Sequence, residues 1–237
     1  MKTLGIIGGI GPQSTLDYYR EIISGYRKIS GSPDYPHIII NSIDMTGMLD
    51  LVARSDYPNL VRLLVSEIEK LKRAGAEFAL IASNTPHIVF DDVKRSSPLP
   101  LISIVEATAE KAQSLKLKRL LLLGTGFTMK SRFYADCLSR YGISVSVPPE
   151  QEQKFIHEVI FDDLEEGIVI PEKKARVVAL CAAIIEKESI DGIILGCTEL
   201  PLMIRDGDFN VAVLNTAGIH IEAAVRVLLE QSSVSGA

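Results

Sequence analysis

The sequence predicts an α/β fold of two similar Rossmann-like or flavodoxin-like domains, each with a parallel sheet, related by a pseudo-twofold axis around a central cleft. Short apolar runs typical of buried strands alternate with amphipathic segments of helical period. Two of these patterns also recur. Gly8 and Gly124, which end two of the apolar runs, are 116 residues apart, and Ser83 and Cys197, at the ends of two others, are 114 apart. Two matches at nearly the same spacing indicate a duplicated unit.

The expected elements follow the hydrophobic pattern along the chain. Residues 57–74 show it most clearly, because leucine and isoleucine recur there at helical spacing and Gly75 ends the run. Glycine and proline mark many of the other boundaries. The strands are predicted at 4–7, 37–42, 78–82, 101–103, 119–123, 145–147, 193–195 and 211–214. The helices are predicted at 12–24, 57–74, 105–114, 131–141, 151–165, 173–187 and 217–230, and no element is predicted for 43–45.

The duplicated pattern also sets the expected domain limits. Residues 1–100 together with 215–237 are predicted to form the first domain, which carries Ser83. Residues 101–214 are predicted to form the second, which carries Cys197. The first domain is discontinuous because the last helix is expected to pack back on the first half of the chain. We also expect the protein to be a homodimer. Because two such halves usually move relative to one another, we expect the cleft to close when the ligand binds.

Composition and charge limit the class of protein. The 237 residues are 47% hydrophobic and 23% charged, which is typical of a folded globular protein. The net charge of −5 argues against a nucleic-acid partner, and no apolar run approaches the roughly 20 residues of a membrane span. Met1-Lys2 leads directly into a strand pattern without a signal peptide, so a cytoplasmic location is expected. Three cysteines without paired metal-ligand spacing suit a reducing compartment.

The stretch from Gly192 to Leu200 is the strongest candidate for chemistry. Its apolar run stops at Gly196, so Cys197, Thr198 and Glu199 come together at the C-terminal end of a buried parallel strand. Ligands bind at that end of open α/β sheets. A thiol, a hydroxyl, a carboxylate and backbone N–H groups can together move a proton and hold an anion. The alternative is that the cysteine is one more small buried residue at a strand end, which is the commoner fate of a cytosolic cysteine.

The earlier copy of this pattern places Ser83, Asn84 and Thr85 after an apolar strand. In a duplicated fold whose halves face each other, Ser83 and Cys197 lie on opposite walls of one cleft. Asn84 and Thr85 are expected to hydrogen-bond a bound carboxylate or ammonium, to cap the next helix, or to do both. His87 is interpreted as structural, because the motif places it past the cleft on the helix.

Two glycine-containing turns are predicted to complete the site. Gly8 and Gly9 let the backbone approach a small substrate closely. They resemble part of a dinucleotide fingerprint, but the third glycine and the acidic residue about 20 positions later are missing, so a dinucleotide cofactor is not expected. In the second half, Thr125, Phe127 and Thr128 belong to a turn with added hydroxyls, which is a candidate cradle for a carboxylate.

Three segments together resemble the signature of the aspartate/glutamate racemase family. They are Gly8 to Thr15, Ser83 to His87 and Leu195 to Leu200, and the resemblance covers essentially the whole chain. It implies an isomerase that racemises an amino acid without PLP, with two facing cysteines for the two faces of the α-carbon. The resemblance therefore implies no cofactor, and the partner is a small amino acid or dicarboxylate. Here Ser83 stands at the first cysteine position, which predicts a direction-biased reaction in which Cys197 acts on the L-substrate.

The side chain of the substrate is less well defined by this resemblance. Two-cysteine aspartate racemases hold the side-chain carboxylate with an arginine after the second strand and a lysine in the helix after the double-proline region. The matching segments here, 42–48 and 161–166, contain no basic residue. Aspartate and/or glutamate are nevertheless the expected substrates.

Three functions compete for this sequence. The first is the amino-acid racemase. The second is a decarboxylase or isomerase of a small dicarboxylate, because one thiol that protonates one face suffices for that chemistry. The third is a catalytically impaired homologue that has kept the fold and binds the ligand.

Overall fold

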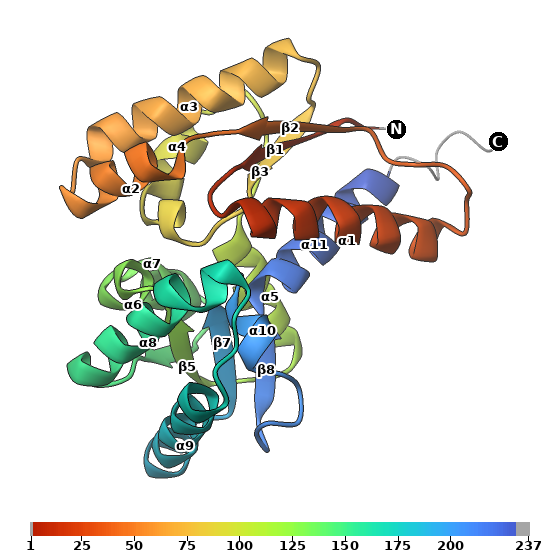
Figure 1. The fold of residues 1–237 in the computed structure, drawn as a ribbon. Coiled ribbons are helices and arrows are strands. Elements are labelled where there is room, and N and C mark those ends of the chain that lie inside the picture. The colour runs from red at the N-terminus through yellow and green to blue at the C-terminus, as the bar shows by residue number, and fades with distance from the viewer. Residues whose placement is uncertain (1, 231–237) are drawn as a thin grey trace. The chain divides into compact units, whose positions relative to one another are not determined.

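The computed structural model describes residues 2–230, which divide into two compact α/β units (Figure 1). The first unit contains residues 2–104 and 217–230, and the second contains residues 105–216. The boundaries therefore fall at 104/105 and 216/217, whereas the predicted domains divide at 100/101 and 214/215. Each unit has a four-stranded parallel sheet with helices between the strands, so the predicted fold class is confirmed.

The first unit is built on four strands: β1 (Leu4–Gly8), β2 (Ile38–Ser42), β3 (Phe78–Ile81) and β4 (Leu101–Ile102). They lie in the order β2-β1-β3-β4, and all neighbouring pairs are parallel. Its helices are α1 (Pro12–Ser30), α2 (Met45–Ala53), α3 (Tyr57–Arg73), the 3-10 helix η1 (Thr85–Val89), α4 (Phe90–Ser96) and, from residue 217, α11 (Thr216–Leu229). Every residue of β1 and β3 is buried, which explains their unbroken apolar runs.

The second unit repeats this architecture with β5 (Arg119–Gly124), β6 (Ser144–Ser146), β7 (Gly192–Gly196) and β8 (Ala212–Asn215). The strand order β6-β5-β7-β8 matches that of the first unit, and the pairs are again parallel. Its helices are α5 (Ile104–Ser114), α6 (Gly126–Lys130), α7 (Phe133–Ser139), α8 (Glu150–Asp162), the 3-10 helix η2 (Leu164–Glu166), α9 (Pro171–Glu188) and α10 (Leu200–Met203).

The registers of the two sheets make Ser83 and Cys197 equivalent positions. Ser83 comes two residues after Ile81, which pairs with Ile7 of β1. Cys197 comes two residues after Leu195, which pairs with Leu123 of β5, the counterpart of Ile7 in the repeat. The duplication predicted from the spacing along the sequence is therefore present both in strand order and in register.

The main differences from the predicted elements are short helices. Helix α2 follows Asp44, whose carboxylate accepts hydrogen bonds from the backbone N–H groups of Thr46 and Gly47. Helix α6 occupies a segment predicted as a turn, and the Thr125 hydroxyl caps it by accepting from the Thr128 N–H at 3.3 Å. The single helix predicted over 151–165 is divided into α8 and η2. Helices this short depend on their caps, and a periodic pattern cannot reveal them.

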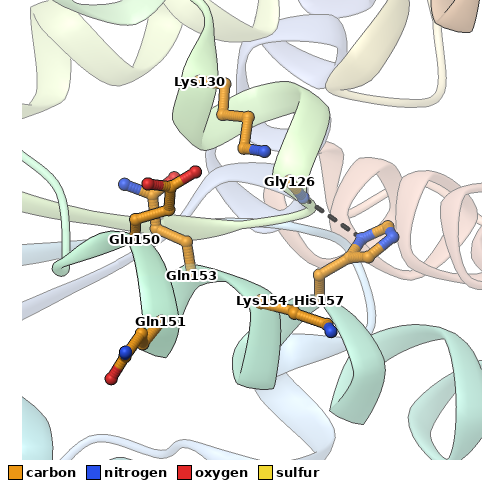
Figure 2. A pocket seen from close by; sticks show the side chains of 7 residues that line it. All are labelled: Gly126, Lys130, Glu150, Gln151, Gln153, Lys154 and His157. Atoms are coloured by element: carbon orange, nitrogen blue, oxygen red, sulfur yellow. Dashed lines mark hydrogen bonds between the residues drawn. The ribbon is translucent and has the colours of Figure 1, made fainter.

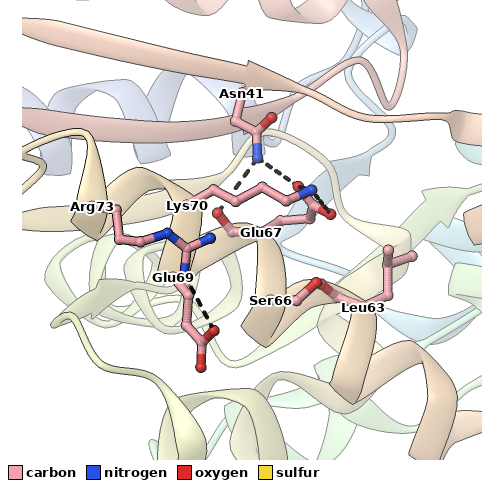
Figure 3. A network of polar contacts seen from close by, with 7 residues as sticks. All are labelled: Asn41, Leu63, Ser66, Glu67, Glu69, Lys70 and Arg73. Atoms are coloured by element: carbon pink, nitrogen blue, oxygen red, sulfur yellow. Dashed lines mark hydrogen bonds and ion pairs between the residues drawn. The ribbon is translucent and has the colours of Figure 1, made fainter.

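A buried carboxylate joins α3 to the edge strand β2 (Figure 3). Glu67 Oε2 accepts from Asn41 Nδ2 at 2.7 Å, and Lys70 Nζ lies 2.7 Å from Glu67 Oε1. Burial by itself raises the Glu67 pKa, but the hydrogen bonds from Lys70 and Asn41 outweigh it, so the pKa is lowered. This network fixes the helix that leads into β3.

Among residues 2–230, no helix is long and apolar enough to span a membrane.

Candidate active site

The Cys197 corner lies at the C-terminal end of β7. A Cβ at Gly196 would lie 2.8 Å from the Leu123 carbonyl oxygen, so glycine is needed where the strand ends. Cys197 is only 8% exposed, and its S–H donates a hydrogen bond to Glu199 Oε2 at 2.8 Å. The Thr198 hydroxyl donates to the same oxygen, also at 2.8 Å. The three polar residues predicted at this strand end therefore form one hydrogen-bonded group.

Burial and negative charge keep the Cys197 thiol protonated in the free protein. Burial raises its pKa well above the ordinary value, and the charge of Glu199, the hydrogen bond to it and the charge of Glu165 act in the same direction. The sulfur is therefore an acid whose proton points at a carboxylate acceptor. A cation placed against these carboxylates would lower the thiol pKa again, because it would offset their negative charge.

Glu165 is a candidate site residue that the sequence pattern does not indicate. It lies in η2 and is half-buried. Its neighbour Leu164 packs in the hydrophobic core that also contains Cys197. On the other side of this turn, Lys173 Nζ lies 2.5 Å from Asp163 Oδ2, and this ion pair ties the turn to α9. The core contact and the ion pair hold Glu165 in the part of the unit that contains the thiol.

The environment of Glu165 changes its acidity. Burial raises its pKa to about 7, and the negative charges of Glu199 and Glu166 add to that effect. A carboxyl group with such a pKa changes its protonation state near neutral pH, which is typical of functional sites. The acidic run at 162–166 resembles a solvated helix end, so residue type and spacing carry no signal for this role.

The Ser83 corner in the first unit is held by backbone hydrogen bonds. The Ala82 N–H donates to the Ile7 carbonyl oxygen at 2.9 Å, and the Ser83 N–H donates to the carbonyl oxygen of Ile81 at 2.8 Å. The Ser83 side chain is half-buried, whereas Asn84 and Thr85 are buried. Asn84 occupies the N-cap position of η1 without a capping side-chain hydrogen bond, so its side chain is not the cap of this helix.

The glycine turn after β1 brings two backbone segments close together. Gly9 has φ +81°, and a Cβ there would lie 2.6 Å from Ser42 Oγ and would overlap the carbonyl oxygen of Ile43. The Gly9 N–H donates to Thr15 Oγ1 at 2.9 Å, and the same hydroxyl donates to the carbonyl oxygen of Gly11, the N-cap of α1. The methyl group of Thr15 packs against Gly8. Gly8 and Gly9 thus shape the end of β1.

The corresponding turn after β5 is organised by Thr125 and Thr128. Thr128 is fully buried, its hydroxyl lies 3.2 Å from Thr125 Oγ1, and its side chain packs against Gly124. Thr128 therefore holds the turn in the way that Thr15 holds the other one. The ring of Phe127 meets the His157 ring edge to face, with centroids 6.0 Å apart.

A cavity of about 310 Å³ opens beside this turn, between α6 and α8 (Figure 2). The Gly126 N–H donates to His157 Nδ1 at 3.2 Å, so the neutral ring carries its proton on Nε2. Lys130 and Lys154 extend along the same cavity, and Glu150 contributes a carboxylate (Figure 2). Burial lowers the His157 pKa and outweighs the negative charges of Glu158 and Asp162, so the ring is neutral near pH 7. No local sequence pattern indicates that His157 supports the turn, because the two are 31 residues apart.

The fold and the site together define a class of protein. A parallel α/β unit is present twice, and the second copy ends a buried strand with a thiol bonded to a carboxylate, an arrangement suited to proton transfer. The comparison with protein families is more specific. The Asp/Glu/hydantoin racemase family model matches residues 7–224, and the chain belongs to this family.

Individual relatives agree with this assignment. The broad specificity amino-acid racemase RacX from Bacillus subtilis is 24% identical over 97% of this chain and 100% of its own length. A glutamate racemase from Aquifex aeolicus is 29% identical over 73% of this chain and 65% of its own length. The crystal structure of an aspartate racemase homologue from Pyrococcus horikoshii is 38% identical, with a TM-score of 0.84, and the match covers 97% of this chain and 100% of that one.

Proposed function

We propose that the chain is an amino-acid racemase that works without PLP, in which Cys197 and Ser83 serve the two faces of the substrate α-carbon. The observation that carries this proposal is the Cys197–Glu199 hydrogen bond at 2.8 Å, because it pairs a buried acid with a carboxylate that can take its proton. The equivalent register of Ser83 supports its assignment to the second face. Family membership supports the class of reaction.

The proton balance of this reaction starts from the protonated thiol. A substrate ammonium group near Glu199 offsets the charge that raises the thiol pKa, and so favours loss of the thiol proton. Glu199 takes this proton from the sulfur and passes it to water. The thiolate then takes the α-hydrogen as a proton, and the electron pair left on the α-carbon is delocalised into the substrate carboxylate. The Ser83 hydroxyl donates a proton to the opposite face and regains one from water. The side chains of Asn84 and Thr85 are proposed to hydrogen-bond the dianionic carboxylate and so to stabilise it.

Ser83→Cys is expected to speed up the half-reaction on the serine side. A thiol, with an ordinary pKa near 8.5, is a far stronger acid than a serine hydroxyl and can also act as a base. We expect a gain of at least roughly tenfold in kcat for the slower direction. The values of kcat/KM in the two directions stay equal, because equilibrium between enantiomers requires it. Chiral chromatography in both directions, with aspartate, glutamate and neutral amino acids, measures the effect.

Ser83→Ala is the matched control, because it removes the hydroxyl without adding a thiol and should be slower than the wild type. If Ser83→Cys folds and binds substrate but changes neither direction, Ser83 does not lie at the reacting carbon. The proposed geometry of the serine face would then be wrong.

Aspartate and glutamate are the proposed substrates, and Glu165 is expected to make their use pH-dependent. With a pKa of about 7, Glu165 is a neutral donor to a side-chain carboxylate at lower pH and an anion that repels it at higher pH. The kcat/KM ratio of aspartate to a neutral amino acid should fall roughly tenfold between about pH 6 and about pH 8. Glu165→Gln should flatten this dependence, and Glu166→Gln, at the exposed neighbour, should keep it. A slope that persists in Glu165→Gln would exclude this role.

A second candidate follows from the single thiol at the two equivalent corners. With Ser83 in the other corner, a decarboxylase or isomerase of a small dicarboxylate, or a homologue that only binds ligand, also fits the site. Solvent deuterium exchange at the α-position separates these functions. Exchange with inversion supports the racemase, exchange without inversion indicates half of its reaction, and tight binding without exchange indicates a binding protein. The homodimer and the cytoplasmic location stay predictions.

A further inference from the structure

Two buried histidines, His87 in η1 and His220 in α11, are packed together inside the first unit. Their side chains are 2% and 0% exposed. The rings meet edge to face with centroids 6.2 Å apart, and Phe90 stacks on His87 at 4.8 Å. Burial, together with the neighbouring His220, lowers the His87 pKa to about 3. Burial lowers the His220 pKa to about 4, so both rings are neutral near pH 7.

The hydrogen bonds of His87 fix its tautomer. The Ile104 N–H donates to His87 Nε2 at 3.3 Å, so this nitrogen carries no proton in the neutral ring. The proton is therefore on Nδ1, which donates to the Ser83 carbonyl oxygen at 2.9 Å. The structural role expected for His87 thus includes a direct bond to the residue proposed for the second face of the substrate.

The hydrogen bonds of His220 fix the opposite tautomer. The Ile102 carbonyl oxygen can only accept, so His220 Nε2 donates to it, at 3.0 Å. His220 Nδ1 then accepts from the Tyr18 hydroxyl, at 2.9 Å. The bond to Ile102 ties α11 to β4.

These bonds join the Ser83 corner to the points at which the chain leaves and re-enters the unit. Ile104 is the last residue of the unit before the chain leaves, and the chain returns at Ala217, three residues before His220. His87 ties the corner to the outgoing segment, and His220 ties the returning helix to the strand just before that segment.

We propose that His87 is a positioning residue for Ser83, in which the Nδ1–H fixes the Ser83 carbonyl and so orients the serine hydroxyl for its half-reaction. This inference rests on the proposed function, which assigns Ser83 to one face of the substrate. A role in packing alone would require a ring of this size against Phe90. A positioning role requires in addition a donor at the Nδ1 position.

Two substitutions distinguish the hydrogen-bonding roles of Nδ1 and Nε2 of His87. His87→Asn places an amide near the Nδ1 position, where its N–H can keep the bond to Ser83. His87→Gln extends the amide to the Nε2 position, where its oxygen can accept from Ile104 but its N–H does not replace Nδ1. Both variants lose the ring and its stacking on Phe90, so both should lose stability to a similar extent. The pair is thus matched in packing and differs in the contact to Ser83.

The measurement is the ratio of inversion to α-hydrogen exchange, in deuterated solvent, for the full chain with the L-amino acid that exchanges fastest. Exchange without inversion requires Cys197 alone, whereas inversion requires both faces. We expect the ratio to fall at least about tenfold in His87→Gln and to stay within about threefold of the wild type in His87→Asn. A smaller folded fraction lowers both rates together and leaves the ratio unchanged, so a stability effect cannot imitate this result.

Equal ratios in the three proteins, or a greater loss in His87→Asn, would overturn the proposal. If the wild type neither exchanges nor inverts any amino acid, the proposed function itself fails. Nitrogen-15 NMR of the ring nitrogens tests the geometry independently of activity. The expected tautomers are Nδ1–H for His87 and Nε2–H for His220, and the opposite tautomer at His87 would also overturn the proposal.

Discussion

Cys197→Ala is expected to lower kcat for racemisation, and the rate of α-hydrogen exchange, by at least about 10³-fold, since loss of an acid–base group commonly costs 10²–10⁴-fold. In the proposed reaction the same group serves as acid in one direction and as base in the other, so both directions should be lost. The substitution removes one sulfur atom from a strand end, so the free energy of unfolding should fall by only about 1 kcal/mol. Kinetics in both directions, together with urea unfolding, distinguish loss of chemistry from loss of fold.

Cys181→Ala is the control for this experiment. Cys181 is fully buried in α9 of the same unit, and burial raises its pKa to about 12, so it is an inert part of the core. This variant should lose stability and keep its activity. A Cys197→Ala protein that keeps more than about a tenth of the wild-type rate has lost under about 1.4 kcal/mol of barrier stabilisation, and Cys197 would not be the catalytic base.

The buried histidine pair is expected to make the first unit unstable in acid. His87 and His220 have folded pKa values of about 3 and about 4, below the ordinary 6.5. The unfolded chain therefore binds more protons than the folded one as pH falls below about 6.5, so stability is lost from there downward and is fully present above it. At about pH 5, each histidine contributes about 2 kcal/mol of destabilisation, or about 4 kcal/mol together. That is a large share of the 5–15 kcal/mol typical of a folded domain.

Urea unfolding at several pH values between about 5 and 8 measures this loss. Glu165 has the opposite effect on the free energy of unfolding over part of this range. Because its pKa is raised in the folded state, it lowers that free energy as pH increases toward 7. Comparison of the wild type with His87→Gln isolates the histidine contribution, since one titrating group is removed and Glu165 is unchanged. The variant should show roughly half of the pH dependence that the pair provides. The same dependence in both proteins would mean that His87 is not held neutral.

The elements that the sequence predicted well are those with a long pattern or a repeat. Residues Tyr57–Arg73 form a helix because apolar side chains recur at helical spacing, and the buried Leu60, Leu64 and Ile68 show that this face packs inward. The strands that end before Ser83 and Cys197 were recognisable because both of their faces are covered, so their residues are apolar without interruption.

The parts of the site that the sequence did not reveal depend on contacts between distant segments or on side-chain geometry. Glu165 lies in a short acidic run, and its raised pKa comes from burial and from Glu199, which is 34 positions away. The hydrogen bond that the Gly126 N–H donates to His157 joins residues too far apart to form a local sequence pattern. The sequence placed Cys197 and Glu199 side by side, but residue order alone does not show that the thiol donates to the carboxylate.

The duplicated register has a stereochemical consequence. Two copies of one corner occupy equivalent positions but are encoded separately, so a substitution at one of them leaves the other unchanged. With a thiol in both copies, a racemase would treat the two hands of its substrate nearly alike. With serine in the first copy and a thiol–carboxylate pair in the second, the proposed reaction acquires a polarity, because the proton donors available to the two enantiomers differ in strength. The separate values of kcat and KM for each hand are therefore adjustable at position 83 alone, without rebuilding the acid–base group at position 197, while kcat/KM stays equal for the two hands.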